Sequence, residues 1–320
     1  MRIGVLTSGG DAPGMNAAIR AVVRFGIERG FEVYGVERGY EGLIDGDLRA
    51  MDRRSVGDIL QRGGTILKTA RSERFLTPEG IARAAQTLET FRIEALVVIG
   101  GEGSMKGALD LSRSHGVNVM GIPGTIDNDL AYTEMTIGFD TAVNTVLDGI
   151  TRIRDTSSSH DRTTIIEVMG RRCGDIALYA GVAGGAEYVL LPEVDTDLND
   201  LCQKVIESKN IGKQHSVIIK AEGFPMDSNE LAEKMAERTG REVKLVVLSY
   251  LQRGGSPTLR DRMLATECGT KAVELLSNGI YNKAIGTVGG EIIGFDLAEA
   301  LAVEPVFDQA LYDSISVLSK

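Results

Sequence analysis

Residues 96–105 read LVVIGGEGSM, an apolar run that ends in three glycines, one acid and a serine. An apolar run without polar alternation predicts a strand buried on both faces, as in a parallel sheet covered by helices. Glycines after such a strand let the backbone turn close to a ligand, and Ser104 can cap the helix that follows. The stretch therefore predicts an α/β fold with a functional turn, where Glu102 presents one carboxylate.

Similar apolar runs recur along the 320 residues, a length that predicts two domains. Segments with helical periodicity lie between them, among them 15–29, 81–91 and 141–154. Strands that alternate with helices predict largely parallel sheets. An exception is 284–295, which predicts a hairpin around the glycine pair 289–290. The runs that predict strands are 3–6, 31–36, 95–100, 117–122, 163–169, 188–191, 216–221 and 243–248.

The composition is that of a soluble protein and excludes several classes of partner. The net charge is −10 at pH 7, whereas duplex nucleic acids are bound by basic surfaces. The N-terminus has no signal-peptide pattern, and no apolar run is long enough to cross a bilayer. Three scattered cysteines, Cys173, Cys202 and Cys268, provide neither a disulfide framework nor a zinc site. We therefore expect a cytoplasmic protein with no nucleic-acid or membrane partner.

Ligands of open α/β sheets bind beyond the carboxyl ends of the strands, so the turns there are candidate sites. In TSGGDAPG (7–14), Gly9 and Gly10 bring backbone N–H groups and the next helix N-terminus to one place. This suits a phosphate, although a tight turn without a ligand has the same signature. In GGEGS (100–104), a carboxylate beside phosphates would need a cation such as Mg2+ between them, and a solvated Glu102 is the alternative. Neither GxGxxG nor GxxxxGK(S/T) occurs in the chain.

The turn PGTIDND (123–129) follows another expected strand and carries two acids. Asp127 and Asp129 are close enough to raise each other's proton affinity. One of them can then act as a general base while the other stays ionised near a metal. A purely structural turn can have the same sequence, so the motif indicates a catalytic pair without proving one.

Two arginines flank the expected strand 163–169. Nine residues separate Arg162 from Arg171, and that much extended chain spans ~30 Å, far more than one small phosphosugar. Either one arginine is structural, or Arg162 reaches a neighbouring subunit's site, which predicts a symmetric oligomer. Arg20 and Arg24 share a helix face, for which a solvated charged stripe is the default interpretation.

Nine stretches, in order along the chain, resemble the motifs of bacterial 6-phosphofructokinases, from Met1 to about Ala302. They are TSGGDAPGMNAAIRAVVR, RGGTILKTAR, VVIGGEGS, PGTIDND, TIGFDTAVNT, RDTSSSHDR, EVMGR, AEG and QRGGSP. The resemblance implies two Rossmann-like three-layer α/β domains with largely parallel sheets and an active site in the cleft between them. It also implies a nucleotide- and magnesium-binding domain at 1–138 plus 252–303 and a sugar-phosphate-binding domain at 139–251 plus 304–320.

The reaction that the resemblance implies is transfer of the γ-phosphate of ATP, with Mg2+, to the 1-hydroxyl of fructose 6-phosphate. The catalytic residues it implies are Gly10, Arg71, Thr125, Asp127, the general base, and Arg171. The implied nucleotide-binding residues are Gly10, Tyr40, Arg71, Ser72, Gly101, Glu102, Gly103 and Ser104, with Glu102 and Asp129 at the metal. The implied sugar-binding residues are Thr125, Asp127, Arg162, Met169, Gly170, Arg171, Glu222, Lys244, Tyr250 and Arg253.

The resemblance further implies a homotetramer with sites at subunit interfaces, in which Arg162 is the arginine that crosses to the neighbouring subunit. It implies an allosteric pocket for ADP or phosphoenolpyruvate. The residues that match this pocket are Arg20, Arg24, Arg53, Asp58, Arg154, the stretch from Gly185 to Glu187, Lys213 and His215.

The chain departs from the family pattern at four positions. Glu102 replaces the usual aspartate, and its extra methylene would disturb octahedral Mg2+, so Mn2+ is an alternative metal. Lys244 replaces an arginine and Tyr250 a histidine, and both changes predict weaker binding of the sugar phosphate. Ile211 stands where the effector pocket usually has a basic residue, which predicts a weak effector response.

Two other functions compete with the ATP-dependent kinase. The pyrophosphate-dependent branch of the family resembles the chain less, because it has an acid in place of Gly103 and a lysine in place of Gly124. A lapsed enzyme that only binds ligands or regulates is the second alternative. Against it, the expected base Asp127 and the phosphate-binding Arg71 and Arg171 are all present.

Overall fold

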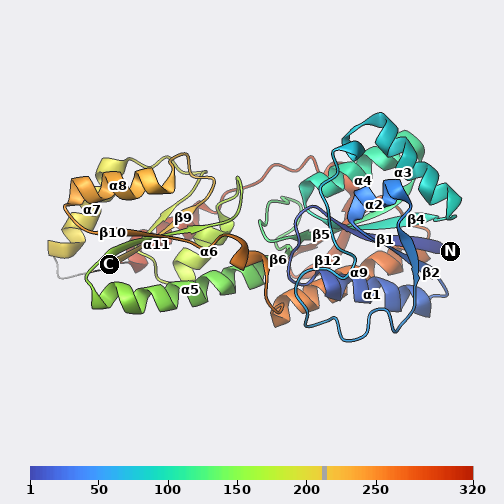
Figure 1. Cartoon of the computed structure of the whole chain (residues 1–320), viewed down its shortest axis with the longest axis horizontal. Helices are drawn as coiled ribbons and strands as arrows, with labels where there is room; N and C mark the ends of the chain where they lie inside the picture. Colours follow the sequence, from blue (N-terminus) through green and yellow to red (C-terminus); the bar gives the residue numbers. More distant parts are fainter. Residues whose placement is uncertain (211–214, 320) are drawn as a thin grey trace. The chain divides into compact units, whose positions relative to one another are not determined.

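The computed structural model of the protein describes residues 1–210 and 215–319. The chain divides into two compact units, each built around its own sheet (Figure 1). Unit 1 comprises Met1–Thr141 and Arg253–Pro305, and unit 2 comprises Ala142–Gln252 and Val306–Lys320. Both units are α/β with largely parallel sheets, so the predicted fold class is confirmed.

The sheet of unit 1 has eight strands: β1 (Arg2–Ser8), β2 (Glu32–Val36), β3 (Leu48–Met51), β4 (Ala95–Gly100), β5 (Asn118–Thr125), β6 (Ile137–Gly138), β11 (Lys283–Val288) and β12 (Glu291–Asp296). Their order is β12-β11-β5-β4-β1-β2-β3, with β6 paired to β5. The interior strands are parallel, and the antiparallel strands β3 and β12 form the two edges. β12 returns from β11 through Gly289 and Gly290, both with positive φ, which confirms the predicted hairpin.

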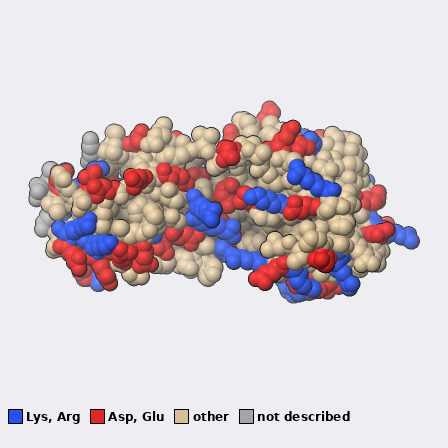
Figure 2. All heavy atoms as spheres, turned by 90° about the horizontal axis from the view of Figure 1, so that it is seen from above, with Lys and Arg blue, Asp and Glu red and all other residues tan. Residues whose placement is uncertain are grey.

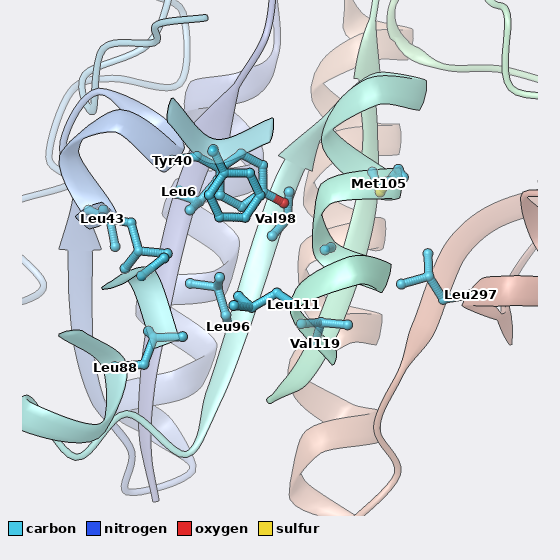
Figure 3. Close-up of a cluster of buried hydrophobic side chains, with 14 of the residues drawn as sticks. Leu6, Tyr40, Leu43, Leu88, Leu96, Val98, Met105, Leu111, Val119 and Leu297 are labelled. Atoms are coloured by element: carbon cyan, nitrogen blue, oxygen red, sulfur yellow. The ribbon is translucent and has the colours of Figure 1, made fainter. Parts of the chain in front are cut away.

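Both faces of this sheet carry helices: α1 (Met15–Glu28), α2 (Gly39–Asp45), α3 (Pro78–Thr90), α4 (Glu102–His115), α9 (Leu259–Ser277), α10 (Leu297–Ala300) and the short 3-10 helix η1 (Arg74–Leu76). On one face α1 packs against α9, where Gly269 allows close approach to the α1 backbone. On the other face α2, α3 and α4 lie against the sheet (Figure 1). There Leu6 and Leu96 of the strands pack with Leu43, Leu88 and Leu111 of the helices (Figure 3). This core holds the ends of β1, β4 and β5 in place.

The sheet of unit 2 is parallel and has the order β10-β7-β9-β8. One face carries Ile165, Leu190 and Ile218, which pack with the helices α7 and α8 around Val205 and Leu231. The helices α5 and α6 cover the other face (Figure 1). The elements of unit 2 are β7 (Thr163–Val168), β8 (Tyr188–Leu190), β9 (Ser216–Ala221), β10 (Val243–Val247), α5 (Phe139–Ser159), α6 (Asp175–Ala183), α7 (Leu198–Asn210), α8 (Ser228–Thr239), α11 (Gln309–Leu318) and the 3-10 helix η2 (Ser249–Arg253).

Each of the eight apolar runs expected to form a strand overlaps one, but two helices begin earlier than their periodicity predicts. α3 begins at Pro78 because Thr77 accepts a hydrogen bond from the Gly80 backbone N–H. α5 begins at Phe139 because the buried carboxylate of Asp261 accepts from the backbone N–H groups of Gly138 and Thr141, at 2.9 and 2.8 Å. Burial raises the pKa of Asp261. A cap supplied 120 residues away in sequence leaves no local signal.

Two of the three cysteines, Cys202 and Cys268, are buried free thiols, and burial raises the pKa of both. Cys173 is partly exposed. In the part of the chain that the structure describes, no helix combines the length and the apolar composition needed to span a membrane. On the face drawn in Figure 2, lysines and arginines are interspersed with aspartates and glutamates.

Candidate active site

Three strand ends of unit 1 lie side by side and form the candidate active site. β1 and β4 are paired through Ser8 and Gly100, and β4 and β5 through Gly100 and Pro123. The turns that follow these strands are therefore neighbours. A methyl group on Gly101 would lie 3.4 Å from the side chain of Thr125. The turns 7–14, 100–104 and 123–129 thus lie side by side at the carboxyl ends of the interior strands β1, β4 and β5.

Glycine is required in these turns because the backbones approach closely. A methyl group on Gly100 would lie 2.6 Å from both the carbonyl oxygen of Ser8 and the hydroxyl of Ser104. Gly9 has φ +87°, which only glycine adopts readily, and its carbonyl accepts a hydrogen bond of 2.8 Å from Thr69. By contrast, a methyl group on Gly103 would meet no atom within 4 Å. Gly103 therefore leaves open space beside the turn.

A guanidinium lies next to the first glycine turn. A methyl group on Gly10 would lie 3.4 Å from Nη1 of Arg253. Arg253 was expected at the sugar phosphate, and the structure places it beside Gly10 within unit 1. Arg71 is exposed two residues after Thr69, which braces the same turn. A glycine turn with a neighbouring arginine suits an anionic ligand such as a phosphate.

Asp127 lies in a turn that hydrogen bonds hold in one shape. Its side chain is buried, with the residue 4% exposed, and its backbone N–H donates to Thr125 Oγ1 at 3.2 Å. Asn128 has φ +55° and accepts from the Thr136 N–H at 3.0 Å, while Thr136 Oγ1 donates to the Thr125 carbonyl at 2.7 Å. A buried carboxylate on a turn fixed in this way is suited to take a proton from a bound hydroxyl. Asp129 is partly buried in the same turn.

The first turn of α4 carries the other expected metal ligand. The Glu102 side chain is 49% exposed, and Lys106 Nζ lies 2.5 Å from its Oε1. Among the residues that the structure describes, no three His, Cys, Asp or Glu side chains cluster as a metal site would require. The half-exposed carboxylate of Glu102 nevertheless fits Mg2+ that arrives with a nucleotide, because Mg2+ takes its other ligands from phosphates and water.

Two residues expected at the nucleotide lie behind the turn. Tyr40 is buried, stacks on Phe75 with ring centroids 3.9 Å apart, and donates a 2.7 Å hydrogen bond to the Ser104 carbonyl. Ser104 itself is also buried. Burial raises the pKa of Tyr40, so its phenol stays a donor. Tyr40 therefore stabilises the first turn of α4 through its hydrogen bond to Ser104.

Ser72 is held by a surface network. Its hydroxyl donates to the carboxylate of Glu41, which also pairs with Arg74 at 2.5 Å. The hydrogen bond from Ser72, followed by that from Arg74, lowers the pKa of Glu41. Arg74 also pairs with Asp45 at 2.7 Å. This network fixes the segment that directly follows Arg71.

In unit 2, the turns after β7 and β9 interlock. The Arg171 N–H donates to Glu222 Oε1 and the Glu222 N–H to the Val168 carbonyl, both at 2.8 Å. A methyl group on Gly223 would collide with the Arg171 carbonyl oxygen. Gly170 has φ +135°, a conformation that requires glycine. The structure thus brings together four of the expected sugar-binding residues: Met169, Gly170, Arg171 and Glu222.

Two further expected residues flank one carboxylate. Glu242 lies between Arg162 and Lys244, with N–O distances of 2.6 and 2.7 Å. The hydrogen bond from Lys244 is the largest cause of the lowered pKa of Glu242. Arg162 precedes β7 and Arg171 follows it, so the two arginines lie at opposite ends of one strand. Tyr250 is 72% exposed.

Residues 2–276 match the Phosphofructokinase family model. The chain belongs to the phosphofructokinase family. It is 57% identical, over 99% of both chains, to the ATP-dependent 6-phosphofructokinase of Clostridium botulinum (strain Loch Maree / Type A3). A relative of the same name from Clostridium tetani is 55% identical, also over 99% of both chains.

Solved structures agree with this family. The phosphofructokinase of Saccharomyces cerevisiae has a TM-score of 0.88 and 35% identity; the match covers 99% of our chain and 47% of the yeast chain. A pyrophosphate-dependent phosphofructokinase from Marinobacter aquaeolei has a TM-score of 0.86 over 99% of our chain and 91% of its own. At 22% identity, that likeness concerns the fold alone.

The residues of this phosphofructokinase that match the effector pocket are found in both units. In unit 2, Arg154 donates to the carbonyls of Gly184 and Gly185 at 2.9 and 2.7 Å, and its Nη1 lies 3.5 Å from Glu187. In unit 1, Arg53 pairs with Glu28 at 2.5 Å. Of the other matching positions, Lys213 and Ile211 lie outside the described residues, and Arg20, Arg24, Asp58 and His215 lie within them.

One polar cluster of this phosphofructokinase escaped the sequence analysis. Lys220 is buried in β9 opposite Glu167 of β7. The signal was present, because a lysine ends the apolar run SVIIK directly before the motif AEG. The pair of Glu102 with Lys106 was also visible as an i, i+4 spacing.

Proposed function

We propose that the protein is an ATP-dependent 6-phosphofructokinase that transfers the γ-phosphate of ATP to the 1-hydroxyl of fructose 6-phosphate. The observation that carries this proposal is the buried Asp127, whose backbone is fixed in the turn after β5, next to the glycine-rich turns after β1 and β4 in unit 1. The names of the relatives that are 55–57% identical support the same donor and acceptor.

The nucleotide and metal belong to unit 1 in this proposal. Backbone N–H groups at Gly10 and at Gly101 to Gly103 bind the phosphates, and Arg71 stabilises the charge on the transferred group. Tyr40 and Ser72 act as supports, because their polar atoms are engaged with Ser104 and Glu41. Glu102 and Asp129 would hold Mg2+, which when bound neutralises phosphate charge. Mn2+ is the alternative metal.

The chemical step requires one proton transfer. Asp127 accepts the proton of the 1-hydroxyl as the hydroxyl oxygen forms its bond to the γ-phosphorus. The bond between that phosphorus and the bridging oxygen breaks, and ADP leaves with that electron pair. Thr125 Oγ1 accepts from the Asp127 backbone N–H, which holds the carboxylate in position for this transfer. The products are fructose 1,6-bisphosphate and ADP.

The sugar phosphate is assigned mainly to unit 2. Met169, Gly170, Arg171 and Glu222 bind the sugar from two interlocked turns. Arg162, Lys244, Tyr250 and Arg253 contribute to binding of the 6-phosphate. We assign Arg162 and Lys244 to the site of a neighbouring subunit of a homotetramer, because Arg162 and Arg171 lie at opposite ends of β7.

A glycolytic role in the cytoplasm follows from this reaction. We further propose that ADP or phosphoenolpyruvate acts as an effector, with a weak response because Ile211 replaces a basic residue. The residues of the effector pocket are Arg20, Arg24, Arg53, Asp58, Arg154, Gly185, Glu187, Lys213 and His215.

Two glycines favour ATP over pyrophosphate as the donor. The open space around Gly103 leaves room for the nucleoside part of the donor. Gly124 is buried, and a methyl group there would lie 2.9 Å from Ile99. The lysine expected at that position in pyrophosphate-dependent enzymes would therefore have to displace the core of this chain.

The experiment that tests the proposal measures fructose 1,6-bisphosphate formation by the purified protein. Fructose 6-phosphate is offered with ATP or with pyrophosphate, each with Mg2+ or Mn2+, and Asp127→Asn is the matched inactive control. We expect turnover with ATP alone. Turnover with pyrophosphate alone, or no turnover although both ligands bind, would refute the proposal.

A further inference from the structure

A lysine is buried in unit 2 next to the turns after β7 and β9, which the proposed function assigns to the sugar. Lys220 is 2% exposed and lies in the interior strand β9, with β7 on one side and β8 on the other. Its register neighbours are Glu167 and Leu190, so these side chains share one face of the sheet. The same face carries Ile165 and Ile218, which belong to the apolar core of unit 2. An ammonium group in such a place is costly unless it is paired.

The ammonium group of Lys220 lies between Glu167 of β7 and the turn that follows its own strand. Nζ lies 3.2 Å from Glu167 Oε2 and 3.4 Å from the carbonyl oxygen of Ala221. It also lies 6.0 Å from the ring centroid of Phe224. The charge of Lys220 contributes to the lowered pKa of Asp227, whose main cause is the backbone N–H groups of Glu230 and Asn229.

Glu167 connects this cluster to the next helix. Its Oε2 accepts a hydrogen bond from Ser228, the buried first residue of α8. Lys220 and Glu167 therefore fix both ends of the segment 221–228: Ala221 at its start and Ser228 at its end. That segment carries Glu222, which in turn accepts from the Arg171 N–H.

We propose that Lys220 is a positioning residue for sugar-phosphate binding. Its ammonium holds Glu167 and the segment 221–228, and through that segment it sets the places of Glu222 and Arg171. This inference rests on the proposed function, because it assigns the two turns to the phosphorylated sugar. An apolar residue would complete the core of unit 2 at lower desolvation cost, so packing alone does not account for a lysine at this position.

The test uses Lys220→Met, which keeps the volume of the side chain and removes the charge. We expect KM for fructose 6-phosphate to rise ~10-fold, with kcat and KM for ATP changed less than ~2-fold. Leu231→Ala is the control, because it opens a cavity in the same core and removes no polar group of the cluster. It should lower Tm and leave KM for the sugar unchanged.

The double variant Glu167→Met with Lys220→Met separates positioning from stability. Removing both charges should restore Tm, because no uncompensated charge remains buried. KM for the sugar should stay high. A sugar KM that recovers together with Tm, or that rises equally in Leu231→Ala, would overturn the proposal. Wild-type turnover of ATP and fructose 6-phosphate tests the proposed function separately.

Discussion

The turns at the strand ends of unit 1 and unit 2 differ in the types of residue that they contain. In unit 1 the turns after β1 and β4 consist largely of glycine, and the turn after β5 adds the acids Asp127 and Asp129. In unit 2 the turns after β7 and β9 present charged side chains, Arg171 and Glu222. The ion pair of Lys220 with Glu167 contacts both ends of the second of these turns. Backbone N–H groups suit phosphates of any nucleotide, whereas placed side chains can select one sugar. From this difference we expect the shape of the proposed nucleotide site in unit 1 to depend on close backbone packing. We expect the shape of the proposed sugar site in unit 2 to depend on a network of polar side chains.

The largest effect should come from Asp127, the proposed base of unit 1. Asp127→Asn removes the proton acceptor and should lower kcat by ~10³-fold, while both KM values change little. Steady-state rates at saturating ATP and fructose 6-phosphate measure this. If Asp127→Asn keeps more than a tenth of the wild-type kcat, Asp127 is not the base.

A substitution in a glycine turn should break unit 1 through packing. Gly100→Ala places a methyl group 2.6 Å from Ser8 and Ser104, and should lower the free energy of unfolding by about 2–3 kcal/mol. Gly103→Ala is the matched control, since its methyl group meets open space. Urea unfolding compares the two variants, and equal losses of stability would contradict the packing argument.

In unit 2, loss of a charge should affect ligand affinity rather than the fold. Lys244→Ala should raise KM for fructose 6-phosphate by ~10-fold, because a half-exposed cation at the proposed phosphate site is lost. Tm should change little, since exposed ion pairs contribute at most about 1 kcal/mol. An unchanged KM would remove Lys244 from the sugar site.

A smaller effect is expected at the first turn of α4. Glu102→Asp shortens the side chain and should separate the carboxylate from Lys106, 2.5 Å away in the wild type. We expect kcat with Mg2+ to rise ~3-fold and the advantage of Mn2+ over Mg2+ to fall. Kinetics in each metal measure this, with Lys106→Met as a second variant that frees Glu102. A decrease of kcat in Mg2+ would show that the glutamate is the better ligand.

The smallest effect concerns pH. Ser72 and Arg74 lower the pKa of Glu41 below its ordinary value of 4.5. The folded state therefore binds the proton less well than the unfolded state, and the stabilisation is present above pH 4.5 and lost as pH falls through the folded pKa. The Tm difference between wild type and Glu41→Gln should shrink below that pH. A difference that grows in acid would reverse the assigned sign.

The two sites also differ in how far the sequence predicts them. The glycine turns and Asp127 were visible, because glycines and acids after an apolar run are local signals. The ion pair of Lys220 with Glu167 joins residues 53 positions apart, and the cap that Asp261 provides for α5 comes from 120 positions away. Such contacts depend on strand register and helix packing, which local patterns do not encode. The burial of Tyr40 was missed for the same reason.

The most direct test of the comparison is amide hydrogen exchange with each ligand alone. A non-hydrolysable ATP analogue with Mg2+ should protect amides in segments 8–12 and 100–105 and leave 221–228 unchanged. Fructose 6-phosphate should protect 169–173 and 221–228. Protection of 221–228 by the nucleotide, or of the glycine turns at 8–12 by the sugar alone, would contradict the division of labour between the two units.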